Sequence, residues 1–496
     1  MTDARAAAAE LERTDELTGD PPRRRAARAD ASQVEAPGNA AGLIVLAALA
    51  TGLLRQGAYF APGQWAMGLI VTGALALALG ARPLSRADLR LPPVPFMFGL
   101  AAWAVVVAAV RGSSPDGLPP ALLAIGIVAV LVVCRRVGAA GRETMLVGIV
   151  VTALVVSVAG WLGLAFRLDA WRWEAQGLWR ASSTLTYPNA MAAVLVPVAL
   201  VVLALLAGRP RSLPLGLAAT GLLIGAGATL SRAGLFALAA GAIVLVAALD
   251  ARTVAKTAVG PFVGAAVALV ALVPSMTASG AASPGLAAVG LLAGVGIGAG
   301  LAFLDPRTAL GVVGATCLTG VLALVALGPA RFGEAAADIA DARLTLASTD
   351  RFHGAQAALG ALGDHPLTGA GPGLTELRWT RADGVQATLR YAHNEYAQVA
   401  AELGLVGATL LAGGLVALAW LLWRARDATG SGALWAGVAA GLCAFAVHSG
   451  LDFIWHIPAI PLLAASLVGL VTPPPTPRSA PPSIHHQPTH RRGESR

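Results

Sequence analysis

Fourteen apolar runs of near-spanning length divide this 496-residue chain. They cover residues 40–54, 62–81, 95–110, 118–133, 145–166, 189–207, 213–230, 233–249, 256–273, 286–304, 309–328, 396–423, 433–449 and 456–471. About 20 apolar residues are needed to cross a bilayer as a helix, and several of these runs are shorter. The sequence therefore predicts an all-α integral membrane protein with 12–14 transmembrane helices. Only 12% of the residues are charged, which agrees with this class.

The basic residues predict the orientation of these helices. With the N-terminus inside, the short inside loops hold thirteen arginines and lysines and the short outside loops hold six. Cytoplasmic loops carry such an excess, so we expect both termini in the cytoplasm and residues 329–393 as one long extracytoplasmic loop. The same inside arginines account for the net charge of +8. No basic stripe with interleaved aromatic residues appears, so the charge does not indicate a nucleic-acid partner.

Residues 1–38 and 472–496 contain too little apolar surface to fold. We expect them to be disordered cytoplasmic tails, the second rich in proline and histidine, on either side of a polytopic membrane domain at 39–471. The first apolar run begins near Ala40, so the first membrane helix is expected to direct insertion into the cytoplasmic (inner) membrane, without a cleaved signal peptide.

Three isolated cysteines, Cys134, Cys317 and Cys443, lie in or beside apolar runs without ligand-like spacing. They are interpreted as packing residues, and we expect no metal and no cofactor. His448, Asp452 and His456 have a spacing that matches no strong zinc signature.

Two outside loops carry arginines that their surroundings do not explain. In the loop from Arg180 to Tyr187-Pro188-Asn189, the proline and asparagine suit a junction at which a helix begins, but Arg180 lies on the side of the membrane where arginine is disfavoured. Arg232 occupies a turn of only a few residues. A guanidinium group suits phosphate oxygens, and a salt bridge to a loop carboxylate is the alternative for Arg232.

The long loop predicts a helix over roughly residues 333–362, which ends at Asp364-His365-Pro366. Arg351 on this helix faces either a lipid phosphate or solvent. The glycines from Gly369 to Gly373 follow neither a strand nor a Lys-Ser/Thr pair, so we interpret them as a flexible turn and not as a nucleotide-binding loop.

The long loop ends in His393-Asn394, and the helix that follows contains Gly404 and Gly407. A histidine exchanges protons near neutral pH, so His393 is a candidate base, with capping of the helix as the alternative. Asn394 and Glu402 are expected to orient neighbouring groups, and the two glycines to allow close approach of another helix.

Four elements, in this order, resemble the O-antigen ligase and O-antigen polymerase family of bacterial membrane glycosyltransferases. They are the loop from Arg180 to Tyr187-Pro188-Asn189, the Ser231-Arg232 turn, the segment from Arg351 to Pro366-x-x-Gly369-x-Gly371, and His393-Asn394-x9-Gly404-x2-Gly407, and the His448-x3-Asp452 turn is similar as well. The resemblance covers roughly residues 150 to 470.

This resemblance implies a GT-C-like helical bundle and a metal-independent, inverting transfer of a glycan from an undecaprenyl-diphosphate carrier to a glycan, lipid or protein acceptor. It makes His393 the base and Arg180, Arg232 and Arg351 the diphosphate ligands, with Asn189 and Asn394 in the substrate site and His448 and Asp452 in supporting roles. The partners implied are the lipid-linked donor, the acceptor and membrane lipids.

Two other functions compete with this one. A transporter or flippase, for example of lipid-linked glycan or bicarbonate, needs ionisable residues near the middle of the bilayer, whereas these helix centres are almost all Ala, Leu, Val and Gly. A structural membrane protein without chemistry is the other alternative. Clustering of Arg180, Arg232, Arg351 and His393 around one site would disfavour the structural role.

Overall fold

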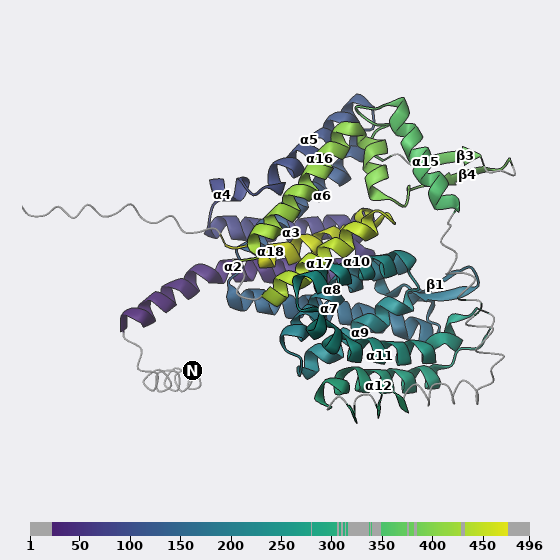
Figure 1. Cartoon of the computed structure of the whole chain (residues 1–496). Coiled ribbons are helices and arrows are strands. Elements are labelled where there is room, and N and C mark those ends of the chain that lie inside the picture. Colours follow the sequence, from purple (N-terminus) through teal and green to yellow (C-terminus); the bar gives the residue numbers. More distant parts are fainter. Residues whose placement is uncertain are drawn as a thin grey trace, which may run out of the picture.

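The computed structural model of the chain is almost entirely helical (Figure 1). It describes residues 22–278, 280–304 and 349–474, except 374–375, 381–383 and 428–431, together with a few single residues and pairs between 305 and 348. The helices are α2 Pro22–Leu54, α3 Ala61–Ala81, α4 Arg86–Leu89, α5 Pro93–Val110, α6 Leu118–Arg135, α7 Ala139–Ala165, α8 Pro188–Gly208, α9 Leu213–Ala228, α10 Arg232–Ala248, α11 Ala251–Met276, α12 Pro284–Gly300, α15 Thr349–Asp364, α16 Glu395–Ala425, α17 Gly432–Ser449 and α18 Ala459–Val471. Short 3₁₀ turns are η1 Gln56–Ala58, η2 Ser114–Gly117, η3 Asp169–Trp171, η4 Ser183–Leu185, η5 Leu301–Phe303 and η6 Ile454–His456. Two antiparallel hairpins pair β1 Arg172–Ala175 with β2 Leu178–Ala181, and β3 Leu377–Thr380 with β4 Gln386–Leu389.

Within the described residues, 10 helices are long and apolar enough to cross a membrane, and α9, α10 and α18 are shorter apolar helices. This confirms the prediction of an all-α, multi-pass membrane protein. Of the predicted span at 309–328 the structure describes only two pairs of residues, so the count of 12–14 stays a prediction. Of the helix predicted over 333–362, the structure describes mainly the part that belongs to α15.

Helix α2, which contains the first candidate span at Ala36–Leu54, begins before the predicted apolar run. α2 starts at Pro22 and therefore runs through the second half of the segment for which the composition predicted disorder. Proline is favoured at the first position of a helix, and the Ala-rich and Arg-rich sequence that follows has high helix propensity. The rest of that tail, residues 1–21, and most of the C-terminal tail, residues 475–496, lie outside the described residues.

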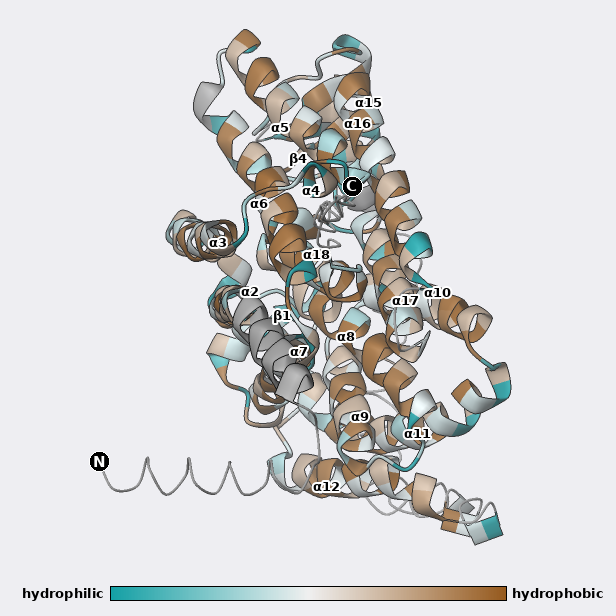
Figure 2. Ribbon diagram, turned by 90° about the vertical axis from the view of Figure 1, so that its left-hand side faces the viewer, coloured by the Kyte–Doolittle hydropathy of each residue, from teal (hydrophilic) through white to brown (hydrophobic). Residues whose placement is uncertain are grey.

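Helix α8 forms the centre of the bundle. Its apolar stretch is 94% buried, and it packs against α7, α9, α10, α11, α17 and α18. A helix that is apolar on every side is stable only when it is surrounded, and Figure 2 shows α8 among its brown, apolar neighbours. The side chains in the first turn of α8 are therefore held in fixed positions.

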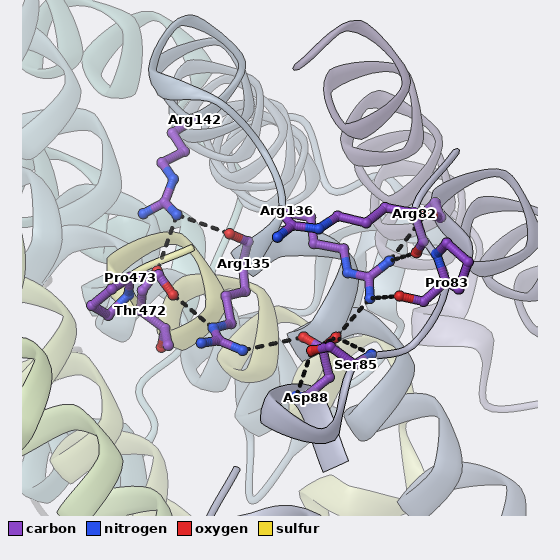
Figure 3. A network of polar contacts seen from close by, with 10 residues as sticks. Arg82, Pro83, Ser85, Asp88, Arg135, Arg136, Arg142, Thr472 and Pro473 are labelled. Carbon is purple, nitrogen blue, oxygen red and sulfur yellow. Dashed lines mark hydrogen bonds and ion pairs between the residues drawn. The ribbon is translucent and has the colours of Figure 1, made fainter. Parts of the chain in front are cut away.

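Three of the segments predicted to lie inside meet at one end of the helices, which we call the arginine end (residues 82–90, 135–142 and 470–473). Asp88 accepts Arg135 Nη1 at 3.2 Å and Arg136 Nη2 at 2.7 Å, and Arg142 Nη2 donates to the Thr472 carbonyl at 3.0 Å (Figure 3). Burial alone would raise the pKa of Asp88, but hydrogen bonds from Ser85 and the Arg136 charge outweigh it, so the pKa lies below its usual range.

The loops predicted to lie outside meet, in the described residues, at the opposite end, which we call the site end (residues 55–60, 111–117, 166–187, 229–231, 277–278, 280–283, 365–373, 376–380, 384–394 and 450–456). Hydrogen bonds join these loops to one another, for example Tyr59 Oη to Tyr391 Oη at 3.0 Å and Arg167 Nη2 to the Thr277 carbonyl at 2.8 Å. In Figure 1, α15 and the β3–β4 hairpin lie on the right, and α4 of the arginine end lies on the left. The alternation of loops predicted from charge thus agrees with two separate ends.

Candidate functional site

The candidate site begins at the N-terminus of α8. Pro188 and Asn189 form its first turn, and Tyr187 immediately precedes it. Asn189 is buried, its Oδ1 accepts Arg180 Nη2 at 2.9 Å, and its Nδ2 donates to Tyr187 Oη at 3.0 Å. The predicted helix junction is present, but the Asn189 side chain is part of a polar network and does not cap the helix.

Asp452 is the centre of this network, in the turn between α17 and η6. Its side chain is 0% exposed and accepts four hydrogen bonds. Oδ2 accepts Tyr187 Oη at 2.8 Å and also Asn189 Nδ2, while Oδ1 accepts the Phe453 backbone N–H at 2.9 Å and His393 Nδ1 at 2.8 Å. A buried carboxylate is stable only when its lone pairs are satisfied, and these donors satisfy them.

His393 faces Asp452 from the residue before the N-cap of α16. Its side chain is 19% exposed and its ring packs edge-on against Phe453, with the ring centroids 5.0 Å apart. In the neutral tautomer that donates from Nδ1 to Asp452, the lone pair of the ring lies on Nε2. The backbone of His393 has a φ of +51°, a strained conformation that L-residues rarely adopt and that is concentrated at functional sites.

Arg180 connects this network to the turn between α9 and α10. Its side chain is buried, and Nε donates to the Thr229 carbonyl at 2.8 Å. Ser231 caps α10 by accepting the Gly234 backbone N–H at 3.1 Å, and Arg232 is the first residue of α10. Arg180 is thus bonded to the turn that immediately precedes Arg232.

The glycine-rich part of the long loop is a turn, as predicted, and it is hydrogen-bonded to α16, which the sequence did not indicate. α16 breaks at Gly404, where φ is +65° and ψ is −169°. Around the break, Ala370 N–H donates to the Ala401 carbonyl at 2.8 Å and Gly371 N–H to the Glu402 carbonyl at 3.0 Å. Leu405 N–H donates back to the Pro366 carbonyl at 2.8 Å. A broken helix in a membrane protein must satisfy its freed backbone groups, and the loop does so here.

The glycines are required for this contact. A Cβ on Gly369 would lie 2.4 Å from the Glu402 carbonyl carbon, and one on Gly404 would lie 2.3 Å from the Leu367 carbonyl oxygen. Both residues also have a positive φ. Gly404 was expected to admit another helix, but what approaches it is the backbone of the loop.

The other predicted site residues have different positions. Asn394 is the N-cap of α16, and its Oδ1 accepts the Ala397 N–H at 3.0 Å, so this residue and not His393 caps the helix. His448 is buried in the last turn of α17, four residues before Asp452. Arg351 lies in the first turn of α15, and its side chain is outside the described residues. Gly354, one turn later, packs close to Ala392, which brings this turn of α15 near His393.

Arg180, Asn189, Asp452 and His393 thus form one continuous hydrogen-bonded network. Sequence reasoning missed Tyr187, whose hydroxyl bonds to both Asp452 and Asn189. The Tyr-Pro-Asn sequence could have indicated it, because it places two polar side chains at the start of one helix. Among the described residues, no group of three or more His, Cys, Asp and Glu side chains is arranged to hold a metal ion.

No protein-family model and no curated protein matches this sequence.

Proposed function

We propose that this protein transfers a glycan from an undecaprenyl-diphosphate carrier to an acceptor at the outer face of the cytoplasmic membrane. The observation that carries the proposal is the pairing of His393 with the buried Asp452, next to the Arg180–Asn189 pair. This combination supplies a base and a cation at one end of a membrane bundle. The resemblance to O-antigen ligases and polymerases assigns the same roles to His393 and Arg180.

In the proposed reaction, His393 Nε2 removes the proton of the acceptor hydroxyl or amine as that group attacks the anomeric carbon. Asp452 keeps the imidazole in the required tautomer and stabilises the imidazolium ion that forms. The bond between the anomeric carbon and the phosphate oxygen breaks, and the diphosphate leaves with the electron pair. In-line attack inverts the anomeric centre.

The leaving diphosphate needs positive charge, which guanidinium groups supply through paired hydrogen bonds. We assign this role to Arg232 and Arg351. Arg180 itself is buried and bonded to Thr229 and Asn189, so its larger contribution is to hold the turn that carries Arg232. With these groups, the proposed mechanism is metal-independent.

The positions of buried ionisable groups favour this function over transport. Among the described residues, Asp88 is buried at the arginine end, and Arg180 and Asp452 are buried at the site end. His448 is buried in the last turn of α17, and Glu395 and Glu402 are buried in the part of α16 that packs against the loops of the site end. Transporters usually place such groups near the middle of the bilayer. The proposal also includes a GT-C-like arrangement of the helices and an extracytoplasmic location of the 329–393 loop.

The test compares His393→Gln with His365→Gln in the full chain reconstituted in nanodiscs. His365 is an exposed histidine of the same loop and serves as the matched control. The measurement is the release of polyprenyl diphosphate from a polyprenyl-diphosphate-linked glycan. We expect His393→Gln to reduce the rate by about 10²–10⁴-fold, the usual contribution of a positioned base, and His365→Gln to leave it unchanged. Wild-type rates in His393→Gln would refute His393 as the base.

A further inference from the structure

Two histidine–carboxylate pairs join the same two segments of the site end. The first is His393 with Asp452, whose Nδ1 and Oδ1 atoms are 2.8 Å apart. The second is His456 with Glu395, whose Nδ1 and Oε1 atoms are 3.4 Å apart. Each segment contributes one histidine and one carboxylate, so the two pairs form a double cross-link around the candidate base.

Glu395 is the buried anchor of the second pair. Its side chain is 2% exposed, and its Oε1 also accepts the Trp455 backbone N–H at 2.5 Å. The Trp455 indole N–H donates to Ser449 Oγ at 2.7 Å, which ties the turn to the end of α17. A buried carboxylate without a cation is costly, so Glu395 favours a protonated His456 and holds the turn after Asp452 in place.

Aromatic rings connect His456 to the candidate base. Tyr391 contacts the His456 ring, with centroids 4.2 Å apart, and stacks on Phe453 at 4.6 Å. His393 packs edge-on against the same Phe453 ring. Tyr391 is fixed in turn by its hydrogen bond to Tyr59. A displacement of His456 would therefore disturb both neighbours of His393, the Phe453 ring and the Asp452 turn.

We propose that Glu395 and His456 are positioning residues for the base. Protonated His456, held by Glu395, keeps the 452–456 turn against α16 so that Asp452 faces His393 Nδ1. When His456 loses its proton, the turn loosens and His393 loses its orientation. The part of this inference that concerns catalysis rests on the proposed function, whereas the positioning of the His393 ring does not.

The charges around His456 agree with this assignment. Burial lowers the pKa of His456, but Glu395 and, less strongly, Glu402 raise it, and Arg390 lowers it slightly, so that the net pKa lies above its usual value. The protonated state thus gains free energy from the fold. That gain is complete below the unfolded-state pKa of about 6.5 and is lost as the pH rises through the higher folded-state pKa.

The first experiment measures the pH profile of glycan transfer for the wild-type protein, Glu395→Gln and the control His365→Gln. Glu395→Gln keeps an oxygen that can accept the Trp455 N–H but removes the charge. We expect the alkaline half-point of the profile to fall by about one pH unit in this variant, because His456 loses its nearest opposite charge. A merely structural role would lower the rate equally at all pH values, and an unchanged half-point would overturn the inference.

The second experiment needs no catalysis, so failure of the proposed function and failure of this inference are distinguishable. It measures the rate at which diethyl pyrocarbonate modifies His393, located by peptide mass spectrometry, in the same proteins. We expect faster modification in Glu395→Gln than in wild type at about pH 6.5, and a ratio that approaches one as the pH rises and His456 loses its proton in both proteins. A ratio that does not change with pH would overturn the positioning role, whether or not the protein transfers glycans.

Discussion

Replacement of Asp452 by asparagine tests the centre of the network most directly. Asp452 accepts His393 Nδ1 and the Phe453 N–H on one oxygen, and Tyr187 Oη and Asn189 Nδ2 on the other. An asparagine has one oxygen and one amide nitrogen, so its nitrogen must face either the His393 and Phe453 donors or the Tyr187 and Asn189 donors. Each orientation has its own penalty.

If the new amide nitrogen faces His393, the imidazole must accept a hydrogen bond on Nδ1 and therefore carries its proton on Nε2. A protonated Nε2 cannot remove the proton of the acceptor group. If it faces Asn189, two amide nitrogens meet, because Arg180 bonds to Asn189 Oδ1 and prevents that side chain from flipping. A buried donor without an acceptor also costs about 1–3 kcal/mol of stability. Because the base is lost or displaced in either orientation, we expect a rate about 10²–10⁴-fold lower, the usual contribution of a positioned base.

The assay is again the release of polyprenyl diphosphate from the lipid-linked donor by protein in nanodiscs. Size-exclusion chromatography and the melting temperature show whether Asp452→Asn is still folded. Asp427→Asn is the matched control, because the Asp427 side chain is 85% exposed in the segment after α16. A folded Asp452→Asn variant that retains more than about a tenth of the wild-type rate would refute the view that Asp452 orients the base.

Two further predictions concern the scaffold. We expect Gly404→Ala to lower the melting temperature. The φ and ψ of this residue fall in a region that costs a non-glycine residue about 1–3 kcal/mol, and the new Cβ would meet the Leu367 carbonyl. The control Gly296→Ala, where a Cβ has open space, should be tolerated. Thermal unfolding of both variants in detergent provides the comparison. Asp88→Asn should destabilise the arginine end by up to about 3–5 kcal/mol, since it leaves Arg135 and Arg136 without their counter-charge, although both keep hydrogen bonds to backbone carbonyls. The pKa of Asp88 is lowered, so its contribution is present above about pH 4 and is lost below it; the stability difference between wild type and Asp88→Asn should therefore shrink in acid, and a constant difference would contradict the assignment.

Much of the fold was predictable because membrane helices are specified locally. An apolar run long enough to cross a bilayer has few alternatives to a helix, and the arginines of the intervening loops separate its two ends. The break in α16 was not predictable in this way. Gly404 stands in an apolar run that resembles any other span, and the break depends on hydrogen bonds from a loop more than 30 residues earlier in the chain.

The candidate site was predictable in part for a similar reason. Arg180 was identified because arginine is disfavoured at its place in the chain, and His393 because a histidine exchanges protons near neutral pH. Asn189 became a candidate only through the resemblance. Asp452 was expected only to support the site, since nothing local indicates that a single carboxylate will receive four hydrogen bonds. Glu395 was missed because an acidic residue in the first turn of a helix is ordinary and needs no functional explanation.

The exchange of hydrogen bonds between the 366–371 loop and the broken α16 restricts how this protein can be recombined with others. A chimera that takes the loop from one parent and the helix from another would separate donors from acceptors that have no water to replace them. Crossover points on either side of the whole 366–405 unit avoid this problem. The β3–β4 hairpin within the unit, by contrast, lies beyond the bonded segment and offers a place for a tag or an inserted domain.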